Sequence, residues 1–436
     1  MNAPVRSYAG SGAYPASYYA ASANPAPLRP ALEGEIAPQI AIVGAGYSGL
    51  SAGIALAEKG HEVVILEGAR VGWGASGRNG GQIVNGLNAS LATIEARYGR
   101  KIADFVGGLV TEGNRLIRER VAKYGIACDL KDGNVFLAYT AKQMKELEAK
   151  QALWRRHGMD EHEMLDRAAL RAHVASDAYM GGMLDRSGGH MHPLNLALGE
   201  AAAFESLGGR IFEASAVEAV EGLDGSAPVL RTARGVVRPK TLILAGNAYL
   251  GHVVPELENR VMPFSTQIMA TEPLGERAKA LLPTDMAFED VRWILDYYRL
   301  SADGRLLFGG GTVYGGTDPA DIKAKLTPNM LKVFPQLKGV RIDYAWSGNC
   351  ALSFSRVPQM GRLGASVYYA TGYSGHGVVG SHLFGKILAE AVDGDLSRFD
   401  VFAKVPWLPF PGGRRFRVAY SVAGSWWYGL RDRLGL

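Results

Sequence analysis

The segment 40–50, Ile-Ala-Ile-Val-Gly-Ala-Gly-Tyr-Ser-Gly-Leu, constrains the fold more than any other part of the chain. It predicts an apolar strand that enters a Gly-x-Gly-x-x-Gly turn and continues as a helix to about Lys59. Gly44 permits the tight turn, Gly46 lets the backbone approach a pyrophosphate, and Gly49 allows the helix to pack on the strand. The free N–H groups and the positive dipole end of that helix then face the two phosphates. The segment therefore predicts a dinucleotide site.

The context of this motif strengthens the prediction. Glycine is common in the chain, at 56 of 436 residues, so the motif alone is a weak signal. A second predicted strand, 61–66, follows the helix and ends at Glu67. That carboxylate lies 18 positions beyond Gly49 (67 − 49), where a ribose hydroxyl needs an acceptor.

Composition narrows the class of protein. The length allows two or three domains, and a hydrophobic content of 47% supports a large core. The net charge of +5 is partly concentrated in a tail with Arg414, Arg415, Arg417, Arg431 and Arg433. No nucleic-acid-binding module accompanies these arginines, so we expect a solvated or subunit-facing tail and no nucleic-acid partner.

Cysteine content and hydropathy indicate the compartment. Two cysteines, Cys128 and Cys350, cannot form a disulfide framework, and no secretory signal precedes the first strand. Residues 40–57 are uncharged, but their glycines and the fitted motif argue against a membrane span. We expect a cytoplasmic protein without a transmembrane segment; its oligomeric state is left open.

A second glycine-rich segment, 70–82, follows Glu67 directly. Its glycines indicate backbone that bends sharply or touches something closely. The alternative is a flexible surface loop, but the position after Glu67 favours a loop that cradles a cofactor. Arg78 and Asn79 are its candidate hydrogen-bond donors.

The rest of the chain predicts alternating elements. Residues 91–171 are expected to be mainly helical, with an amphipathic helix at 141–157. Strands are expected at 210–212, 216–220, 229–237 and 241–245, the last ending near Gly246. Aromatic or β-branched strands at 261–272, 291–300 and 305–308 predict a second, more antiparallel sheet. His190 and His192 lack a third ligand and are expected to be surface or turn residues, so no metal site is predicted.

Three motifs together resemble those of the D-amino-acid oxidase and glycine oxidase superfamily of FAD enzymes. They are the Gly44–Gly49 turn with Glu67, the loop 72–82, and Thr-Gly-Tyr-Ser-Gly-His-Gly at 371–377. The loop sequence and Leu-Pro-Phe-Pro-Gly-Gly at 408–413 most resemble the gamma-glutamylputrescine oxidoreductase group. The likeness extends from about Tyr18 to the end of the chain.

The resemblance implies an α/β fold in which a Rossmann-like, glutathione-reductase-type FAD-binding domain carries an inserted antiparallel-sheet substrate domain. The expected division has an N-terminal arm at 1–35 and a C-terminal tail at 401–436. The FAD-binding domain is expected at 36–95, 185–260 and 346–400, and the substrate domain at 96–184 and 261–345.

The resemblance also implies how FAD binds. The glycines of the first turn would hold the pyrophosphate, Glu67 the adenosine ribose, and the backbone of Val217 the adenine. Arg78, Asn79 and Gly80 would lie near the isoalloxazine, with the 375–377 turn at its pyrimidine edge, where a helix N-terminus stabilises reduced flavin. The expected cofactor-binding residues are Gly44, Gly46, Tyr47, Ser48, Gly49, Glu67, Gly74, Ala75, Ser76, Arg78, Asn79, Gly80, Gln82, Val217, Gly246, Gly372, Gly375, His376 and Gly377.

The FAD is expected to be non-covalent, because the loop offers no His and Cys350 is slightly out of register with the Cys that some relatives use. The expected catalytic residues are Arg78, Tyr373 and His376. Tyr297, Tyr298, Tyr314, Trp346 and Tyr373 are aromatic candidates for the substrate pocket, with core packing equally open for each.

The implied reaction is oxidation of a primary amine by hydride transfer to flavin, giving an aldehyde, ammonia and, with O2 as acceptor, H2O2. The substrate expected is gamma-glutamylputrescine or a related gamma-glutamyl polyamine, whose distal carboxylate would meet Arg292, Arg299 or Arg305. The segment 305–308 lacks the lysine that sarcosine-oxidase-like relatives place over the flavin, which leaves the O2 reaction without its usual cation.

The sequence leaves other functions open. One is a D-amino-acid or N-methyl-amino-acid dehydrogenase that passes electrons to quinone and docks on a membrane through Trp426 and Trp427. For a D-amino acid, Arg78 would grip the carboxylate. A non-catalytic FAD-binding subunit and a nicotinamide enzyme are further alternatives.

Overall fold

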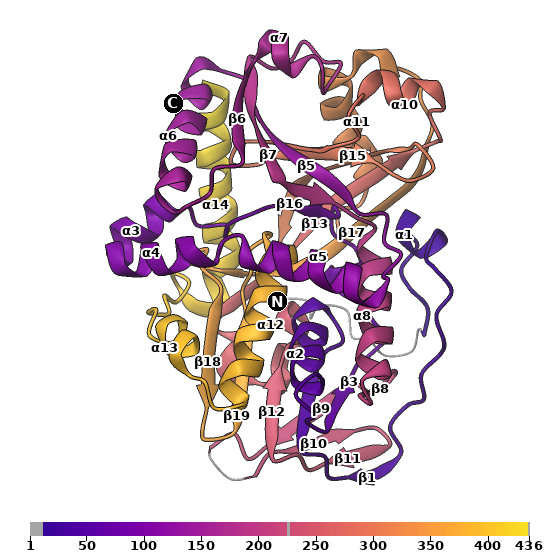
Figure 1. Ribbon diagram of the computed structural model, residues 1–436, viewed down its shortest axis with the longest axis vertical. Helices are drawn as coiled ribbons and strands as arrows, with labels where there is room; N and C mark the ends of the chain where they lie inside the picture. Colours follow the sequence, from indigo (N-terminus) through magenta and orange to yellow (C-terminus); the bar gives the residue numbers. More distant parts are fainter. Residues whose placement is uncertain (1–11, 225–226, 435–436) are drawn as a thin grey trace.

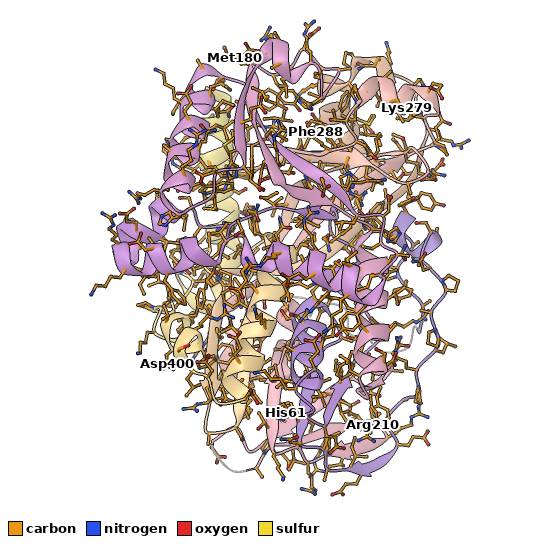
Figure 2. All side chains as sticks on the ribbon, in the orientation of Figure 1. His61, Met180, Arg210, Lys279, Phe288 and Asp400 are labelled. Carbon is orange, nitrogen blue, oxygen red and sulfur yellow. The ribbon has the colours of Figure 1, made fainter. Side chains whose placement is uncertain are left out.

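The computed structural model describes residues 12–224 and 227–434 and confirms the predicted α/β class (Figure 1). The molecule has two halves. One contains a six-stranded sheet covered by helices, and the other is built on a nine-stranded sheet. In the all-side-chain view, His61 and Arg210 mark the end of the first half, and Met180 and Lys279 mark the opposite end (Figure 2). Phe288 lies within the second half.

The helices alternate with strands for most of the chain. The α-helices are α1 (Tyr18–Ala21), α2 (Tyr47–Ala57), α3 (Leu91–Tyr98), α4 (Arg100–Leu109), α5 (Glu112–Tyr124), α6 (Ala141–Arg156), α7 (Arg167–Leu170), α8 (Pro193–Ser206), α9 (Pro255–Glu258), α10 (Glu276–Leu281), α11 (Ile322–Val333), α12 (Gly377–Val392), α13 (Ser397–Ala403) and α14 (Gly413–Leu434). The strands are β1 (Gly34–Ile36), β2 (Ile40–Val43), β3 (Val63–Leu66), β4 (Gln82–Ile83), β5 (Lys131–Ala138), β6 (His162–Asp166), β7 (Gly181–His190), β8 (Arg210–Phe212), β9 (Val217–Glu221), β10 (Val229–Thr232), β11 (Gly235–Val237), β12 (Thr241–Leu244), β13 (Val261–Thr271), β14 (Ala287–Asp290), β15 (Asp296–Leu300), β16 (Leu306–Tyr314), β17 (Ile342–Ser353), β18 (Gln359–Leu363) and β19 (Val367–Thr371).

The six-stranded sheet has the order β18-β19-β12-β2-β3-β8, and only β18 runs antiparallel to its neighbour. Successive side chains of a strand point to opposite faces. Ile42 and Ile65 belong to the cluster under the helices α2, α5, α8 and α12, whereas Ala41 and Val64 belong to a second cluster with the strands of the sheet β1-β11-β10-β9. Both faces are therefore buried, which explains the continuous apolar runs in β2 and β3.

The nine-stranded sheet has the order β17-β13-β16-β15-β14-β5-β7-β4, with β6 paired to β7. One face packs against α11, where Phe288, Tyr298 and Phe308 stack in a row. Because neighbouring residues alternate, Glu289 and Tyr297 lie on the other face. That second face is the one turned toward the first half of the molecule and carries the site described below.

Several expected elements are corrected by the structure. Residues 91–171 are mainly helical, as expected, but the strands β5 and β6 interrupt the helices and pair with β7. The strand expected at 229–237 is two short strands joined by a turn. The strand expected at 291–300 begins only at Asp296, because Arg292 pairs with Asp290 and Asp296 and closes a loop between β14 and β15.

Two of the expected domain boundaries fall inside strands. β7 crosses residue 185 and β17 crosses residue 346, and both strands belong to the nine-stranded sheet. The expected arm begins outside the described residues, but Tyr18 and Tyr19 are buried against the rest of the protein. The expected tail forms α14, whose Arg417 donates to the carbonyls of Glu258 and Val261.

Candidate flavin and substrate site

Four parallel strands of the six-stranded sheet end at one edge. β2 is followed by Gly44, β3 by Glu67, β12 by Ala245 and Gly246, and β19 by Gly372. Ligands of open α/β sheets bind at this carboxyl edge. The structure thus brings together predicted residues that lie more than 300 positions apart in sequence.

The glycine turn has no room for side chains. A Cβ on Gly49 would lie 1.9 Å from the carbonyl oxygen of Gly44, and one on Gly46 would lie 2.8 Å from Ser76 Oγ. Ser76 also accepts a hydrogen bond of 3.0 Å from the Tyr47 backbone N–H at the start of α2. The second glycine-rich segment therefore lies directly against the first, and the N-cap residue Gly46 supplies no side-chain acceptor of its own. This arrangement fits a pyrophosphate.

Glu67 is buried at the edge of the sheet. Its carboxylate accepts hydrogen bonds from the backbone N–H of Ala45 at 2.8 Å and of Ala69 at 2.9 Å. Burial raises the pKa of Glu67 to about 7. An additional donor such as a ribose hydroxyl would favour the ionised form. Val217 begins β9, two positions after Ser215, whose N–H donates to the Glu67 carbonyl.

A cavity of about 850 Å³ lies between the two halves. Loop 75–82, the 374–379 turn and strands β14–β17 contribute to its lining, together with parts of α6 and α14. Of the predicted site residues, those in the lining are Ala75, Arg78, Asn79, Gly80, Gln82, Gly375, His376 and Gly377. The volume is large enough for a flavin ring and a small substrate together.

Arg78 and Asn79 are fixed by the protein itself. Arg78 donates to the carbonyls of Gly74 and Ser347 and to the Tyr249 hydroxyl, and its guanidinium lies over Trp73. Asn79 Nδ2 donates to the carbonyls of Ala75 and Ser76, and its Oδ1 accepts from the Gly81 N–H. These contacts hold the loop on the sheet. We therefore no longer expect Arg78 to grip a substrate carboxylate.

The last glycine-rich turn presents His376 to the cavity at the N-terminus of α12. Its Nδ1 atom is buried and has no hydrogen-bond partner among the residues that the structure describes. Burial lowers the pKa of His376 to about 4, so the ring is neutral at pH 7. Ser374 and Gly375 both have positive φ, 56° and 95°, which bends the turn around this position. An unpartnered ring nitrogen at a helix N-terminus fits the polar edge of a flavin.

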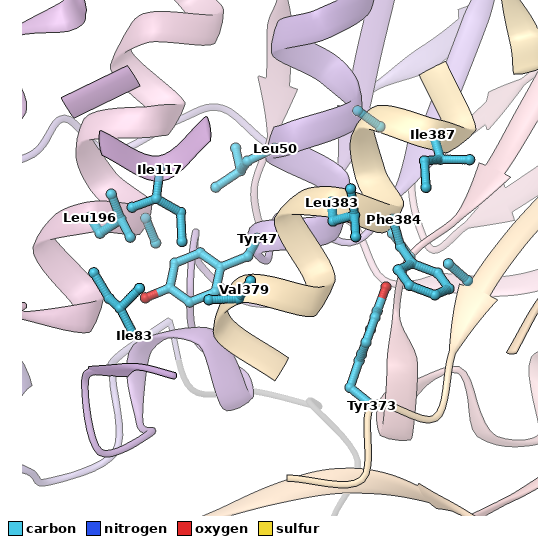
Figure 3. Packing of buried hydrophobic residues seen from close by; sticks show 14 of the residues in the cluster. Tyr47, Leu50, Ile83, Ile117, Leu196, Tyr373, Val379, Leu383, Phe384 and Ile387 are labelled. Carbon is cyan, nitrogen blue, oxygen red and sulfur yellow. The ribbon is translucent and has the colours of Figure 1, made fainter. Parts of the chain in front are cut away.

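Tyr373 does not line the cavity, contrary to the catalytic role expected for it. Its hydroxyl lies 2.5 Å from Ser48 Oγ, and its ring packs edge-on against Phe384 between α2 and α12 (Figure 3). Tyr47 also turns away from the cavity and donates to the Pro193 carbonyl. Tyr47 and Ser48 can therefore contact a cofactor only through their backbone.

The structure separates the other expected pocket residues into two groups. Tyr297 and Tyr314 line the cavity, whereas Tyr298 lies on the opposite face of the sheet and Trp346 donates to the Arg78 carbonyl. Arg299 is buried with its donors on carbonyls and the Tyr19 hydroxyl, and Arg305 pairs with Asp303 and Asp343. Arg292 lines the cavity, but two aspartates neutralise it.

Glu289 and Lys150 are site residues that sequence reasoning missed. Glu289 is only 6% exposed, lines the cavity, and forms no hydrogen bond or salt bridge with a described side chain. Lys150 of α6 also lines it, with Nζ 3.5 Å from the centre of the Phe136 ring. Burial raises the pKa of Glu289 to about 7 and lowers that of Lys150 to about 8, while each charge favours the other. The available signal was an acidic pair, Glu289 and Asp290, at the end of a short buried strand.

An aromatic stack lies at the opening of the cavity. Tyr428 of α14 stacks on Trp293 at 3.9 Å between ring centres, with Arg356 over Trp293 and Arg431 over Tyr428. All four residues line the cavity, and Trp293 is 46% exposed. Neither arginine forms a salt bridge with a described acidic side chain. We call these four residues the mouth stack.

The two histidines of the 188–193 segment, expected to be surface or turn residues, are both buried. His190 lies against the Asp285 carbonyl at 2.7 Å, and His192 caps α8 through Nδ1. Burial lowers the pKa of each to about 3. Within the described ranges, no group of three His, Cys, Asp or Glu side chains could hold a metal ion.

Within residues 12–224 and 227–434, no helix combines the length and the apolar composition needed to cross a bilayer.

A glycine turn at a parallel sheet edge, joined to a large cavity under a second sheet, is the arrangement expected of a flavin-dependent oxidoreductase. Residues 39–391 match the family described as DAO, FAD dependent oxidoreductase, and the chain belongs to this family. Its cofactor is therefore FAD, and the predicted superfamily is confirmed.

Relatives and solved structures agree with this assignment. The chain is 50% identical over 422 residues to gamma-glutamylputrescine oxidoreductase of Escherichia coli, covering 96% of this chain and 99% of that protein. It is 38% identical to a probable oxidoreductase of Haemophilus influenzae, over 96% and 97% of the two chains. Glycine oxidase from Geobacillus kaustophilus shares the fold, with a TM-score of 0.68 at 22% identity over 83% of this chain and 98% of that one.

Proposed function

We propose that this protein oxidises the free primary amino end of gamma-glutamylputrescine or a related gamma-glutamyl amine. The observation that carries the proposal is the 50% identity, over nearly the full length of both chains, to an enzyme named for that substrate. The cavity supports it, because it has an apolar wall with Trp154, Phe136 and Tyr297 and charged groups at separate places.

Bound FAD supplies the two-electron acceptor for oxidation of the C–N bond to an imine, which water hydrolyses to an aldehyde and ammonia. The protein's task is to bind the amine in a dry pocket and to favour its neutral form, since a free alkylamine has a pKa of about 10.4. The cavity is suited to this because much of its wall is apolar.

For the cofactor itself, we propose the roles expected from sequence with two changes. The glycine turn and α2 hold the pyrophosphate, Glu67 the ribose, Val217 the adenine, and the 375–377 turn the flavin edge. Tyr47 and Ser48 act through their backbone, and Arg78 and Asn79 act by fixing the loop. Cys350 lines the cavity, and burial raises the pKa of its thiol to about 11. A non-covalent link remains our prediction.

We propose O2 as electron acceptor, with H2O2 as product, and a cytoplasmic location. The support for O2 is family likeness alone, because Arg305–Phe308 offers no lysine. Both cysteines are free, which agrees with a reducing compartment.

The test is anaerobic mixing of the holoenzyme with gamma-glutamylputrescine, followed by admission of air. We expect rapid bleaching of the flavin absorbance, release of one aldehyde and one ammonia per turnover, and prompt reoxidation with H2O2 formation. No bleaching by this amine would contradict the substrate, and reoxidation over minutes would contradict O2 as the acceptor.

One observation favours a second candidate, a dehydrogenase of D-amino or N-methyl amino acids that reduces quinone. The outer face of α14 exposes Phe416, Tyr420, Trp426, Trp427 and Leu430, with Trp426 77% exposed. Apolar side chains beside arginines are typical of helices that lie on a membrane. Co-sedimentation with the membrane fraction and activity with quinone but not O2 would favour this alternative.

A further inference from the structure

The cavity contains two charged regions that the family assignment leaves without a role. One is the carboxylate of Glu289, and the other is the mouth stack with its two arginines. Neither Glu289 nor these arginines form a salt bridge with a described side chain. A buried carboxylate without a partner is costly, so its retention in a cavity wall indicates a ligand of opposite charge.

The position of Glu289 is set by strand pairing. Glu289 lies opposite Phe136 on β5 and opposite Tyr297 on β15, and Tyr297 lies opposite Gly309 on β16. Directly paired residues share a face of the sheet. The Tyr297 ring in turn lies against Gly80, whose Cβ would be 2.6 Å from it. Glu289 is therefore one strand away from the loop expected to hold the flavin ring.

Lys150 lies on the far side of Glu289 from that loop, over the Phe136 and Trp154 rings. Its ammonium is close enough to favour the ionised form of Glu289, but the two groups do not form a salt bridge. The carboxylate thus keeps its oxygens for a ligand. Lys150 acts on it as a positioning residue.

The mouth stack forms another part of the cavity lining, and its Trp293 follows Glu289 by four positions in the loop between β14 and β15. Arg356 lies beside Tyr314, the last residue of β16. Glu289 lies two strands away from Gly309 of β16, and Tyr314 lies five residues further along that strand. With the usual strand spacing and rise per residue, the Cα atoms of Glu289 and Tyr314 are roughly 19 Å apart. The ammonium and carboxylate of an α-amino acid share one carbon and cannot span such a distance. A long molecule with an ammonium at one end and a carboxylate at the other can.

We propose that the cavity recognises its substrate by the charges at both ends. Glu289 binds the ammonium that is oxidised and accepts its proton, and the mouth stack, through Arg356, binds a carboxylate at the far end. This inference rests on the proposed amine oxidation and specifies how the gamma-glutamyl amine is oriented. The proton passes from the substrate nitrogen to the Glu289 carboxylate, which leaves a neutral amine and a neutral acid.

The experiment measures kcat/KM of two variants, each with two amines. Glu289→Gln is expected to lower kcat/KM at least tenfold for both gamma-glutamylputrescine and butylamine, because both carry the reacting ammonium. Arg356→Gln is expected to lower it ten- to a hundredfold for gamma-glutamylputrescine and less than threefold for butylamine. Arg362→Gln is the matched control, because Arg362 of β18 is exposed, lies over the Tyr368 ring of β19 and does not line the cavity.

A binding measurement separates the two ends without turnover. The gamma-glutamyl amide of butylamine keeps the carboxylate but has no terminal amine to oxidise. Its Kd, followed through the flavin spectrum, is expected to rise at least tenfold in Arg356→Gln and to stay within threefold in Glu289→Gln. Glu289→Asp, which keeps the charge, is expected to recover part of the lost kcat/KM and shows that a loss in the Gln variant is not misfolding.

The outcomes separate this inference from the proposed function. If gamma-glutamylputrescine fails to reduce wild-type flavin, the proposed function fails and this orientation with it. If wild-type flavin is reduced but Arg356→Gln lowers kcat/KM equally for both amines, the mouth stack does not bind the carboxylate. If Glu289→Gln lowers kcat/KM only for gamma-glutamylputrescine, Glu289 binds the α-ammonium of the glutamyl group. The substrate then lies in the orientation opposite to the one proposed.

Discussion

The pyrophosphate end and the substrate end of the site are built in different ways. At the end proposed to hold the pyrophosphate, glycines within one short turn leave no room for side chains, and backbone N–H groups are the proposed ligands. At the substrate end, side chains from β14, α6, the loop after β17 and α14 meet in one cavity. The first arrangement is local in sequence, and the second exists only after the sheets have formed. Changes at the two ends should therefore have different consequences.

The largest effect is expected from Gly49→Ala. The added Cβ would lie 1.9 Å from the Gly44 carbonyl oxygen, so α2 must move away from β2. We expect protein purified without FAD and with a markedly lower Tm, measured by the ratio of flavin to protein absorbance and by calorimetry. Gly108→Ala is the control, because a Cβ there meets nothing within 4 Å in α4. Equal FAD content in the two variants would contradict the cradle.

Glu67→Gln tests the ribose end of the same region. The amide cannot accept from both backbone N–H groups, and it offers a weaker acceptor to a ribose hydroxyl. We expect FAD affinity to fall about ten- to a hundredfold, as for a charge-assisted hydrogen bond of about 1.5–3 kcal/mol. Titration of the apoprotein by flavin fluorescence gives the Kd, and an unchanged value would remove Glu67 from the site.

The same residue predicts a pH dependence of apoprotein stability. Burial raises the pKa of Glu67 from its ordinary value of 4.5 to about 7, so the folded protein holds a proton that the unfolded chain releases. This contribution to the free energy of unfolding is present below pH 4.5 and is lost as the pH rises to about 7. The Gln variant should lack this decline, and Tm values across pH 4.5–8 would show whether it does.

Lys150→Gln tests the substrate end with a smaller effect. Lys150 favours the ionised form of Glu289, whose pKa is about 7. Without Lys150 that pKa rises, so the acid limb of kcat/KM moves to higher pH. We expect up to tenfold lower kcat/KM for butylamine at pH 6.5 and little change at pH 9. If the acid side of the pH profile of kcat/KM does not shift in the variant, Glu289 does not control this step.

The smallest effect is expected from Tyr373→Phe. Only the hydrogen bond to Ser48 is lost, and the ring keeps its packing against Phe384. We expect kcat/KM within twofold of wild type and a decrease of about 0.5–1.5 kcal/mol in the free energy of unfolding. A hundredfold loss of kcat/KM would restore the catalytic role first expected for this residue.

Sequence predicted the glycine turn and the elements around it because their signal is contiguous. Gly44, Gly46 and Gly49 follow one apolar strand, Glu67 ends the next, and the loop after it lies where expected. The strand at 367–371 and the helix after His376 were also predicted within a few residues. In each case the backbone conformation is set by residues next to each other in the chain.

The substrate end was predicted poorly because its members meet only through tertiary structure. Arg299 and Arg305 lie in the expected strands, yet their guanidinium groups are engaged away from the cavity. Glu289 lies in a short strand that the hydrophobic pattern did not reveal, and Arg356 follows a turn with no motif. The tail was expected to be solvated or subunit-facing, but Tyr428 and Arg431 of α14 line the cavity.

The most direct test of this account compares anaerobic flavin reduction of the wild-type enzyme by gamma-glutamylputrescine and by putrescine. The two amines share the reacting end and differ in the distal carboxylate that the mouth stack is proposed to bind. We predict a kcat/KM ten- to a hundredfold higher for gamma-glutamylputrescine, corresponding to one charge-assisted contact of about 1.5–3 kcal/mol. Equal values would show that the far end of the cavity reads no charge and would leave a general amine oxidase.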